Sequence, residues 1–387
     1  MWFFRAPESY FGEDALDQLN ELTMQRVFIV TDENLVQLGH VQRVQDALPT
    51  ADSHIFAEVE PDPSVKTIKR GANLMHEVGP DWIIGLGGGS CMDAAKAMWI
   101  LYERPDLEPE EISPFETLNL RQKAHLICIP TTAGTGSEAS HGIVLTDTEE
   151  QRKLTLGSRE VTPDIAIVDP VFTAHLPQQI TADSGIDALT HAVEAFSCNW
   201  ANDFSDGLAL QAARMVFDYL PRAVKNGADD EEAREKMANA AAIAGMTLGN
   251  SQVALAHAFG HSAGAVFHQI PHGRITAIFL PYTIQFVANG GVGRYGDLAM
   301  ILGLPHEDEA SAARQLAAAV CQLMQNIGQP TNLREVGISK DALDTNLSLL
   351  CDHVEMDANT LMSRRYPERD EIEQIFRYAF DGREVDF

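Results

Sequence analysis

The chain has few basic residues for its length. Its 387 residues include 56 acidic side chains but only 28 lysines and arginines, which gives a formal net charge of −28. A surface this acidic repels the phosphate backbone of nucleic acids. A general nucleic-acid-binding function is therefore not expected.

Cysteines and long apolar runs are also scarce. The five cysteines are scattered and form no Cys-x-x-Cys pair, which favours reduced thiols over a disulfide framework. The first residues, MWFFRAPESYFG, lack the basic region and apolar run of a signal peptide. No stretch approaches the roughly 20 apolar residues that cross a bilayer. We therefore expect a cytoplasmic protein that does not bind membranes.

The first half of the chain alternates strand-like and helix-like segments. Apolar runs that predict buried strands are VFIVTD (27–32), SHIFAEVEPDPS (53–64), DWIIGLGGGS (81–90), HLICIP (125–130) and IAIVDPVF (165–172). Helical patterns lie after Asn34, over 65–79 and over 91–101. This alternation predicts a parallel, Rossmann-like sheet with helices on both faces.

The second half has a different composition. From Ile186 onward, alanine-rich, helix-forming segments dominate and strand signals nearly vanish. We therefore predict two domains, an α/β domain over 1–180 and an all-helical domain over 181–387.

Two loops rich in small residues follow predicted strands. GLGGGSCMDAAK (85–96) lies between a strand and a helix, where glycines and free N–H groups can approach a phosphate. It only approximates the dinucleotide pattern Gly-x-Gly-x-x-Gly, and a tight turn is the alternative reading. TTAGTGSE (131–138) follows the next strand. Because ligands bind outside the carboxyl ends of parallel strands, two such loops favour a long phosphorylated ligand.

Asp32 ends the first predicted strand. A carboxylate there can accept hydrogen bonds from the adenosine ribose and would repel a 2′-phosphate. In the common Rossmann order this acid follows the glycine loop by about 20 residues, whereas Asp32 precedes it. By its position alone, Asp32 suits a cap of the next helix as well as it suits ribose binding.

Histidines cluster in AHAFGHSAGAVFHQIPHG (256–273). His257 and His261 are four residues apart, as are Asp187 and His191 upstream, so a helix would place each pair on one face. One carboxylate and three imidazoles suit a divalent iron or zinc ion. Isolated histidines near apolar residues are more often structural. We assign that role to His268, directed toward a pocket wall or packed behind the ligands.

Four segments together resemble the iron-containing, or group III, alcohol dehydrogenase family. They are GGGSCMDAAK, IPTTAGTGSE, GIDALTHAVEAF and AHAFGHSAGAVFHQIPHG, which occur in the family's order. The resemblance implies a dehydroquinate synthase-like architecture, in which a catalytic metal lies between the two domains. It also implies an NAD(H)-linked reaction on a small alcohol or aldehyde, and a homo-oligomer, dimeric or larger.

Matching the motifs residue by residue implies a set of site residues. The metal ligands are Asp187, His191, His257 and His272, and His261 moves a proton near the nicotinamide. The cofactor contacts are Asp32, Gly87, Gly88, Gly89, Ser90, Asp93, Thr131, Thr132, Thr135 and Lys153. Asp32 implies NAD rather than NADP. Four ligands favour Fe²⁺, with Zn²⁺ as the alternative.

The chain departs from the family near its C-terminus, where RRYPER (364–369) replaces an Asn-Pro-Arg-like pattern. We expect a change in substrate shape or in packing there. Two other functions remain open: a dehydroquinate-synthase-like or polyol enzyme that also uses NAD and a metal, and a non-catalytic nucleotide-binding protein. Leu248, Phe259 and Phe267 are candidates for an apolar substrate pocket.

Overall fold

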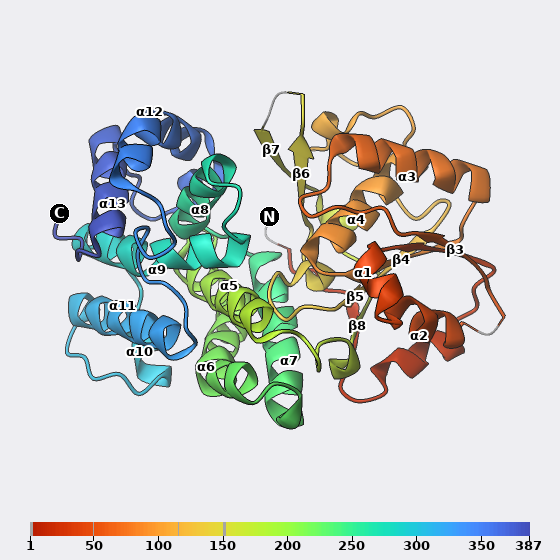
Figure 1. Cartoon of the computed structure of the whole chain (residues 1–387), viewed down its shortest axis with the longest axis horizontal. Helices are drawn as coiled ribbons and strands as arrows, with labels where there is room; N and C mark the ends of the chain where they lie inside the picture. The colour runs from red at the N-terminus through yellow and green to blue at the C-terminus, as the bar shows by residue number, and fades with distance from the viewer. Residues whose placement is uncertain (1–2, 49, 115, 150–151) are drawn as a thin grey trace. The chain divides into compact units, whose positions relative to one another are not determined.

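The chain forms two compact units. The computed structural model describes residues 3–48, 50–114, 116–149 and 152–387. The first unit ends at His175 and the second begins at Leu176, close to the boundary that the sequence predicts near residue 180. Figure 1 shows strands gathered in the first unit and helices in the second.

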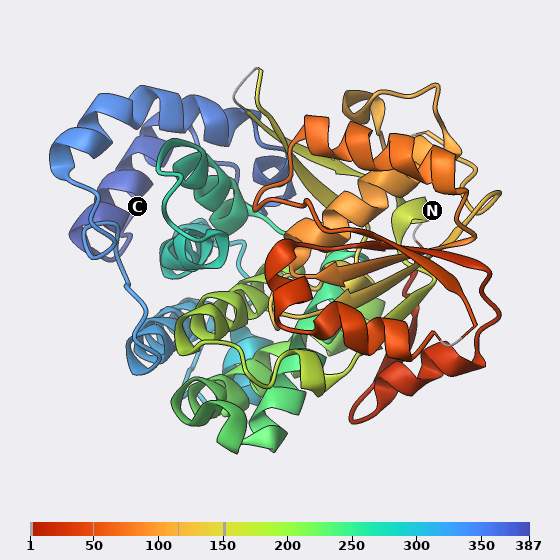
Figure 2. The same cartoon turned by 45° about the vertical axis from the view of Figure 1, so that its right-hand side comes forward.

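The first unit is built on a parallel sheet, as the sequence predicts, and the sheet has six strands. Their order is β1-β8-β5-β4-β2-β3, and each neighbouring pair is parallel. The strands are β1 (Glu8–Phe11), β2 (Arg26–Val30), β3 (Asp52–Phe56), β4 (Trp82–Gly87), β5 (His125–Pro130) and β8 (Ile165–Val168). Figure 2 shows helices on both sides of this sheet. β1 was not predicted.

Successive side chains of each strand point to opposite faces of the sheet. In β2, Phe28 and Val30 pack in a core that includes residues of α3 (Val65–Val78) and α4 (Gly89–Glu103). Val27 and Ile29 pack in a second core with residues of α2 (His40–Asp46). All four side chains are fully buried. Burial on both faces explains why the strands read as continuous apolar runs in the sequence.

Three segments differ from the prediction. The helical pattern after Asn34 is divided into α1 (Glu33–Gln37) and α2, because Gly39 adopts a left-handed conformation with φ of +79°. The strand predicted over 53–64 ends at Phe56, before the prolines. An antiparallel hairpin, which the prediction missed, joins β6 and β7. These strands are Gly142–Asp147 and Arg152–Gly157.

The second unit contains helices and no strand among its residues 176–387. They are α5 (Gln178–Ser197), α6 (Asp203–Asn226), α7 (Glu231–Leu248), α8 (Leu255–Val266), α9 (His272–Asn289), α10 (Gly296–Ile301), α11 (Glu309–Asn326), α12 (Lys340–Met356) and α13 (Arg369–Asp381). The predicted helical domain is thus confirmed. Across the described ranges, no helix combines the length and apolarity needed to cross a bilayer.

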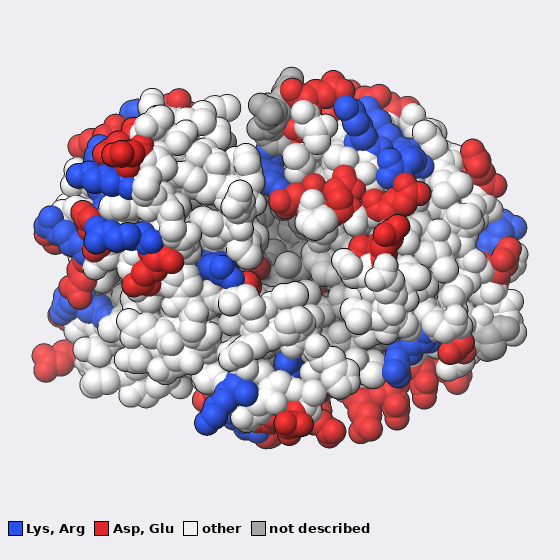
Figure 3. All heavy atoms as spheres, viewed as in Figure 1, with Lys and Arg blue, Asp and Glu red and all other residues white. Residues whose placement is uncertain are grey.

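Acidic and basic side chains share the surface of both units. In the face drawn in Figure 3, Asp and Glu form several patches, and Lys and Arg lie among them. Many of the arginines make ion pairs, such as Arg222 with Asp230 and Arg377 with Asp344. The chain has twice as many acidic as basic side chains, so its net charge remains strongly negative.

Helices α8 and α9 pack closely at Gly260. A Cβ atom built on Gly260 would lie 2.4 Å from Thr276 Oγ1 and 2.8 Å from Thr276 Cα. Only hydrogen fits there, so the two helix backbones can approach each other. Gly264, one turn further along α8, is different, because its nearest neighbour would be Ile275 Cγ2 at 3.8 Å.

We expect Gly260→Ala to lower the free energy of unfolding by about 1–3 kcal/mol, because the added methyl group overpacks the helix contact. Gly264→Ala is the matched control. It should leave stability unchanged or raise it by up to about 1 kcal/mol, since alanine favours helix. Urea unfolding followed by circular dichroism measures both. Equal effects of the two substitutions would contradict this account of the contact.

Candidate metal centre and cofactor loops

One face of α5 carries three acidic or imidazole side chains. Asp187, His191 and Glu194 follow at intervals of four and three residues, which places them along one side of a helix. All three are buried within the second unit. Buried ionisable groups are costly unless they are paired or bind a metal. Their partners come from α8 and from the first residue of α9.

Three imidazoles surround the carboxylate of Asp187. The distance from Asp187 Oδ1 to Nε2 is 3.9 Å for each of His191, His257 and His272. Two atoms that each lie about 2.1 Å from one ion are separated by roughly 3.4 Å in a tetrahedron and by at most about 4.2 Å. All three distances therefore fall within the reach of a single cation.

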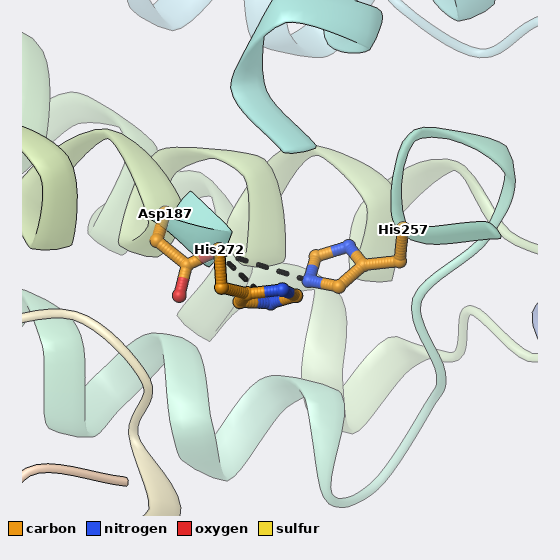
Figure 4. Close-up of side chains that lie close together, drawn as sticks. All are labelled: Asp187, His257 and His272. Atoms are coloured by element: carbon orange, nitrogen blue, oxygen red, sulfur yellow. Dashed lines mark ion pairs between the residues drawn. The ribbon is translucent and has the colours of Figure 1, made fainter. Parts of the chain in front are cut away.

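Figure 4 shows Asp187, His257 and His272 pointing toward one another from α5, α8 and α9. Their ligand atoms all lie within 4.8 Å of one another. His191 stands outside this mutual set, but its ring stacks on that of His257 at a centroid distance of 4.7 Å. The structure thus brings together all four side chains that the resemblance implies as ligands.

Two atoms at the centre of this cluster have no hydrogen-bond partner. They are Asp187 Oδ1 and His257 Nε2, and both are buried. Burial raises the pKa of Asp187, whereas burial and the neighbouring imidazoles lower the pKa of His257 well below its ordinary value. His257 is therefore neutral, as a metal ligand must be. A carboxylate oxygen and an imidazole nitrogen without hydrogen-bond partners, with two further imidazoles beside them, fit a divalent iron or zinc ion.

Gly273 allows α9 to begin next to α5. A Cβ atom on Gly273 would lie 2.2 Å from the carbonyl oxygen of Asp183 and 2.8 Å from Asp187 Cβ. Arg274 reinforces this contact with two hydrogen bonds of 2.9 Å to the Asp183 carboxylate. The Pro-His-Gly turn thus holds His272 against the face of α5 that carries Asp187.

His261 lies beside the cluster and has its own acidic partner. Its Nδ1 is 2.8 Å from Asp357 Oδ2, and its ring stacks on His272 with the centroids 5.4 Å apart. Burial opposes ionisation of Asp357, but the hydrogen bond with His261 and its charge lower the pKa of the carboxyl below its ordinary value. An ionised Asp357 accepts the Nδ1 proton, which leaves the lone pair on Nε2.

Two expectations about neighbouring side chains are wrong. His268 is exposed, so it does not have the structural role packed behind the ligands. Phe259 is not a pocket residue. It is fully buried and packs on Phe279 and Phe376. The helix periodicity explains this, since position 259 lies two residues from His257 and faces the opposite side of α8. Leu248 and Phe267 are partly buried.

The segment RRYPER (364–369) contributes to packing. Arg364 Nε donates to the carbonyl of Ser197 at 3.0 Å. Arg365 donates to the carbonyl of Phe286 at 2.7 Å, and its guanidinium lies 3.8 Å from the centre of the Phe286 ring. The departure from the family pattern therefore ties the C-terminal segment to the ends of α5 and α9.

The two small-residue loops lie against each other in the first unit. A Cβ atom on Gly89 would lie 2.9 Å from Thr135 Cγ2, and one on Gly88 would lie 3.5 Å from the Thr132 side chain. The backbone of Thr131 donates to the carbonyl of Gly87 at 2.9 Å. No side chain caps α4 at its N-terminus. The open helix end and the glycines fit a pyrophosphate.

Asp93 supports these loops from behind. Its Oδ1 accepts a 2.6 Å hydrogen bond from Ser137 Oγ, and its Oδ2 accepts one of 2.9 Å from the Val144 backbone. Lys96 is fully buried and donates to the same Ser137 hydroxyl at 2.7 Å. Asp93 is thus bound to Ser137 in the second loop and to Val144 in β6, the strand that follows it.

Asp32 both caps a helix and faces the glycine loop. Its Oδ1 accepts hydrogen bonds from the backbones of Asn34 and Leu35, at 2.8 and 3.1 Å. Its Oδ2 accepts a hydrogen bond from Cys91 Sγ, 3.6 Å away, near the start of α4. Asp32 therefore caps α1 and also lies beside the glycine loop, so the cap and the ribose-binding role, which the sequence left as alternatives, do not exclude each other.

A residue outside the predicted set links Ser90 with Lys153. The backbone of Asp62 donates to Ser90 Oγ at 3.2 Å, and its carboxylate pairs with Lys153 Nζ at 2.6 Å. Asp62 has a φ of +58°, a conformation that Asp adopts more readily than most residues. Lys153 is thus held beside the N-terminus of α4.

Sequence reasoning missed three residues that shape these sites: Glu194, Asp357 and Asp62. Only Glu194 carried a signal, because it continues the helical spacing of Asp187 and His191. Asp357 is 96 residues from His261. Asp62 lies in a proline-containing loop far from Lys153 in the sequence. No local pattern marks either of these two.

The parallel sheet with its two loops of small residues, and the buried carboxylate–histidine cluster, fit a dinucleotide- and metal-dependent oxidoreductase. Residues 6–170 match the family described as iron-containing alcohol dehydrogenase, and residues 181–380 match the C-terminal part of the Fe-containing alcohol dehydrogenase family. The chain therefore belongs to the iron-containing alcohol dehydrogenase family.

Individual relatives agree with this assignment. The NADPH-dependent butanol dehydrogenase of Clostridium saccharobutylicum is 38% identical, over 100% of both chains. The bifunctional aldehyde-alcohol dehydrogenase of Escherichia coli K12 is 35% identical over 96% of this chain. The chain spans 45% of that relative's length.

Solved structures share the whole fold. The iron-containing alcohol dehydrogenase of Thermococcus thioreducens has a TM-score of 0.89 at 30% identity, over 99% of this chain and 100% of that one. Sulfoacetaldehyde reductase of Bifidobacterium kashiwanohense, in complex with NAD⁺, has a TM-score of 0.85 at 28% identity, over 98% of both chains. The protein is a metal-dependent, NAD(P)-linked alcohol oxidoreductase, and the synthase-like alternative is not favoured.

We expect His272→Ala to weaken zinc binding at least about 100-fold, because it removes a ligand that would directly contact the ion. His268→Ala is the control, since His268 is exposed and only four residues away. Competition with a chromogenic chelator measures the affinity of each metal-free protein. Unchanged zinc affinity in His272→Ala would exclude the ligand assignment.

Proposed function

We propose that the protein interconverts a small alcohol and its aldehyde, with NAD(H) as the hydride carrier and a divalent metal held by Asp187, His191, His257 and His272. One observation carries the proposal. Three imidazole Nε2 atoms each lie 3.9 Å from the same buried carboxylate oxygen, which has no hydrogen-bond partner. A purely structural cluster would leave that oxygen desolvated without compensation.

A divalent metal acts as a Lewis acid on the substrate oxygen, and NAD(H) accepts or donates the hydride. The chain supplies one carboxylate and three imidazoles, a set that suits Fe²⁺ and also accommodates Zn²⁺. We favour Fe²⁺ because the set has four protein ligands. Burial of Asp187, His191 and His257 keeps water from three of the ligands.

We propose that His261 accepts and returns the substrate proton. Asp357 accepts a hydrogen bond from Nδ1, so Nε2 carries the lone pair and can receive a proton. The ring of His261 stacks on that of His272, so Nε2 of His261 lies close to a proposed metal ligand. The ring is partly buried, not sealed from solvent, so a proton can leave after transfer.

The cofactor loops have complementary roles in this proposal. The backbone around Gly87, Gly88, Gly89 and Ser90 binds the pyrophosphate, together with Thr131, Thr132 and Thr135. Asp93 acts by holding the second loop through Ser137. Lys153, fixed by Asp62, adds a positive charge. Asp32 selects NAD over NADP through its negative charge, which would repel a 2′-phosphate, although one relative is named as NADPH-dependent.

We also propose a homo-oligomer that works in the cytoplasm. The support for the oligomer is the family resemblance. The support for the compartment is that all five cysteines are free, and four of them are buried. Unpaired thiols are the rule where glutathione keeps proteins reduced.

The function is tested by loading metal-free protein with Fe²⁺ under anaerobic conditions, or with Zn²⁺, and assaying straight-chain aldehydes from two to four carbons with NADH. We expect turnover in the loaded protein and none without metal. His261→Gln should keep its metal but lose roughly 100-fold in kcat, as expected for removal of a proton-transfer group. If the fully metal-loaded protein turned over none of these aldehydes with NADH, and none of the corresponding alcohols with NAD⁺, the proposal would be overturned.

We expect Asp32→Ser to shift the ratio of kcat/KM values for NADH and NADPH toward NADPH by about 10–100-fold, because it removes a charge that repels the 2′-phosphate. Serine can still cap α1, so the helix should remain. Asp32→Asn separates the loss of charge from the change in size. An unchanged ratio in both variants would show that Asp32 does not select the cofactor.

A further inference from the structure

Glu194 connects the metal-ligand face of α5 with the start of α8. Its Oε1 accepts a hydrogen bond from the Ala256 backbone at 2.6 Å, and its Oε2 lies 2.5 Å from His257 Nδ1. The carboxylate is 4% exposed, and so is the His257 side chain. Both contacts span more than 60 residues of sequence.

Helix α8 has no cap of its own. Ala254 occupies the N-cap position and provides no side-chain hydrogen bond. The carboxylate of Glu194 instead binds an N–H group of the first turn, where a negative charge is also favoured by the helix dipole. A residue of α5 thus fixes where α8 begins and therefore where His257 stands.

The second contact determines which nitrogen of His257 can bind a cation. When a carboxylate accepts the Nδ1 proton, the imidazole keeps its lone pair on Nε2. Nε2 is the atom that lies 3.9 Å from Asp187 Oδ1, and it has no hydrogen-bond partner.

We propose that Glu194 is a positioning residue for the metal, which orients the His257 ring and sets its tautomer while it holds the first turn of α8 against α5. The inference rests on the proposed role of His257 as a ligand. One face of α5 then has two functions. Asp187 and His191 bind the metal directly, and Glu194 acts on it through His257.

Glutamine at position 194 is the sharpest test, because it has nearly the same shape but only one acceptor oxygen. The amide cannot accept hydrogen bonds from both Ala256 N and His257 Nδ1. Its NH₂ group would instead donate to one of these positions, which disfavours either the start of α8 or the required tautomer. We expect Glu194→Gln to weaken zinc binding about 10–100-fold.

The control is Ser262→Ala, also on α8. Ser262 is buried and its Oγ donates to the carbonyl of Leu350 at 2.7 Å, away from the ligand atoms. This substitution removes a buried hydrogen bond from the same helix. A general loosening of α8 would weaken zinc binding in both variants, whereas a positioning role weakens it only in Glu194→Gln.

The experiment compares zinc affinity, by chelator competition, and thermal unfolding of the metal-free forms for wild type, Glu194→Gln and Ser262→Ala. Nitrogen-15 spectra of labelled histidine, with His257→Ala for assignment, report the His257 tautomer. If Glu194→Gln does not fold, Glu194→Asp takes its place, because the shorter side chain cannot reach both partners.

Weaker zinc binding with loss of the Nδ1–H tautomer in Glu194→Gln, and binding within about 2-fold of wild type in Ser262→Ala, is the expected result. Wild-type affinity in Glu194→Gln, or equal losses in both variants, would overturn the inference and leave the proposed function intact. Failure of the wild-type protein itself to bind zinc or iron would overturn the proposed metal centre and the inference together.

Discussion

The burial of the Asp187 carboxylate without a protein hydrogen-bond donor at Oδ1 is the constraint on which the site depends. Such an atom costs free energy that no neighbouring side chain in the cluster offsets, since the nearby imidazole nitrogens are 3.9 Å away. In the proposed metal centre, a cation would remove that cost and would also bind the lone pair of His257 Nε2, which has no hydrogen-bond partner. The proposal thus explains why these groups are buried together.

Helix packing creates the site. Backbone contacts at Gly260 and Gly273 let α8 and α9 approach their neighbours so closely that no Cβ atom would fit. These contacts, together with the carboxylates of Asp183 and Glu194, fix two helix starts against α5. Ligand positions within a few tenths of an ångström need such rigid support, because helices and their close contacts move less than loops.

Close backbone contacts also hold the two loops of the first unit, where we propose that the dinucleotide binds. The two loops touch through Gly89 and Thr135, and a buried network around Asp93, Ser137 and Lys96 supports them. In the proposed function, phosphate recognition depends on backbone N–H groups and on the end of α4. The close contacts at Gly87 and Gly89 explain why the loop needs small residues there.

The sequence by itself determined the alternation of strands and helices, the helical second half, and the residue types of the site, because periodicity and i,i+4 spacing are local properties. It could not separate helix α1 from α2, nor predict the β6–β7 hairpin, and it placed Phe259 in a pocket. Only the tertiary structure decided that Glu194 meets His257, that Asp357 meets His261 and that Asp62 meets Lys153. Those pairs join residues distant in the chain, and their geometry follows from how helices and strands pack, which no local pattern encodes.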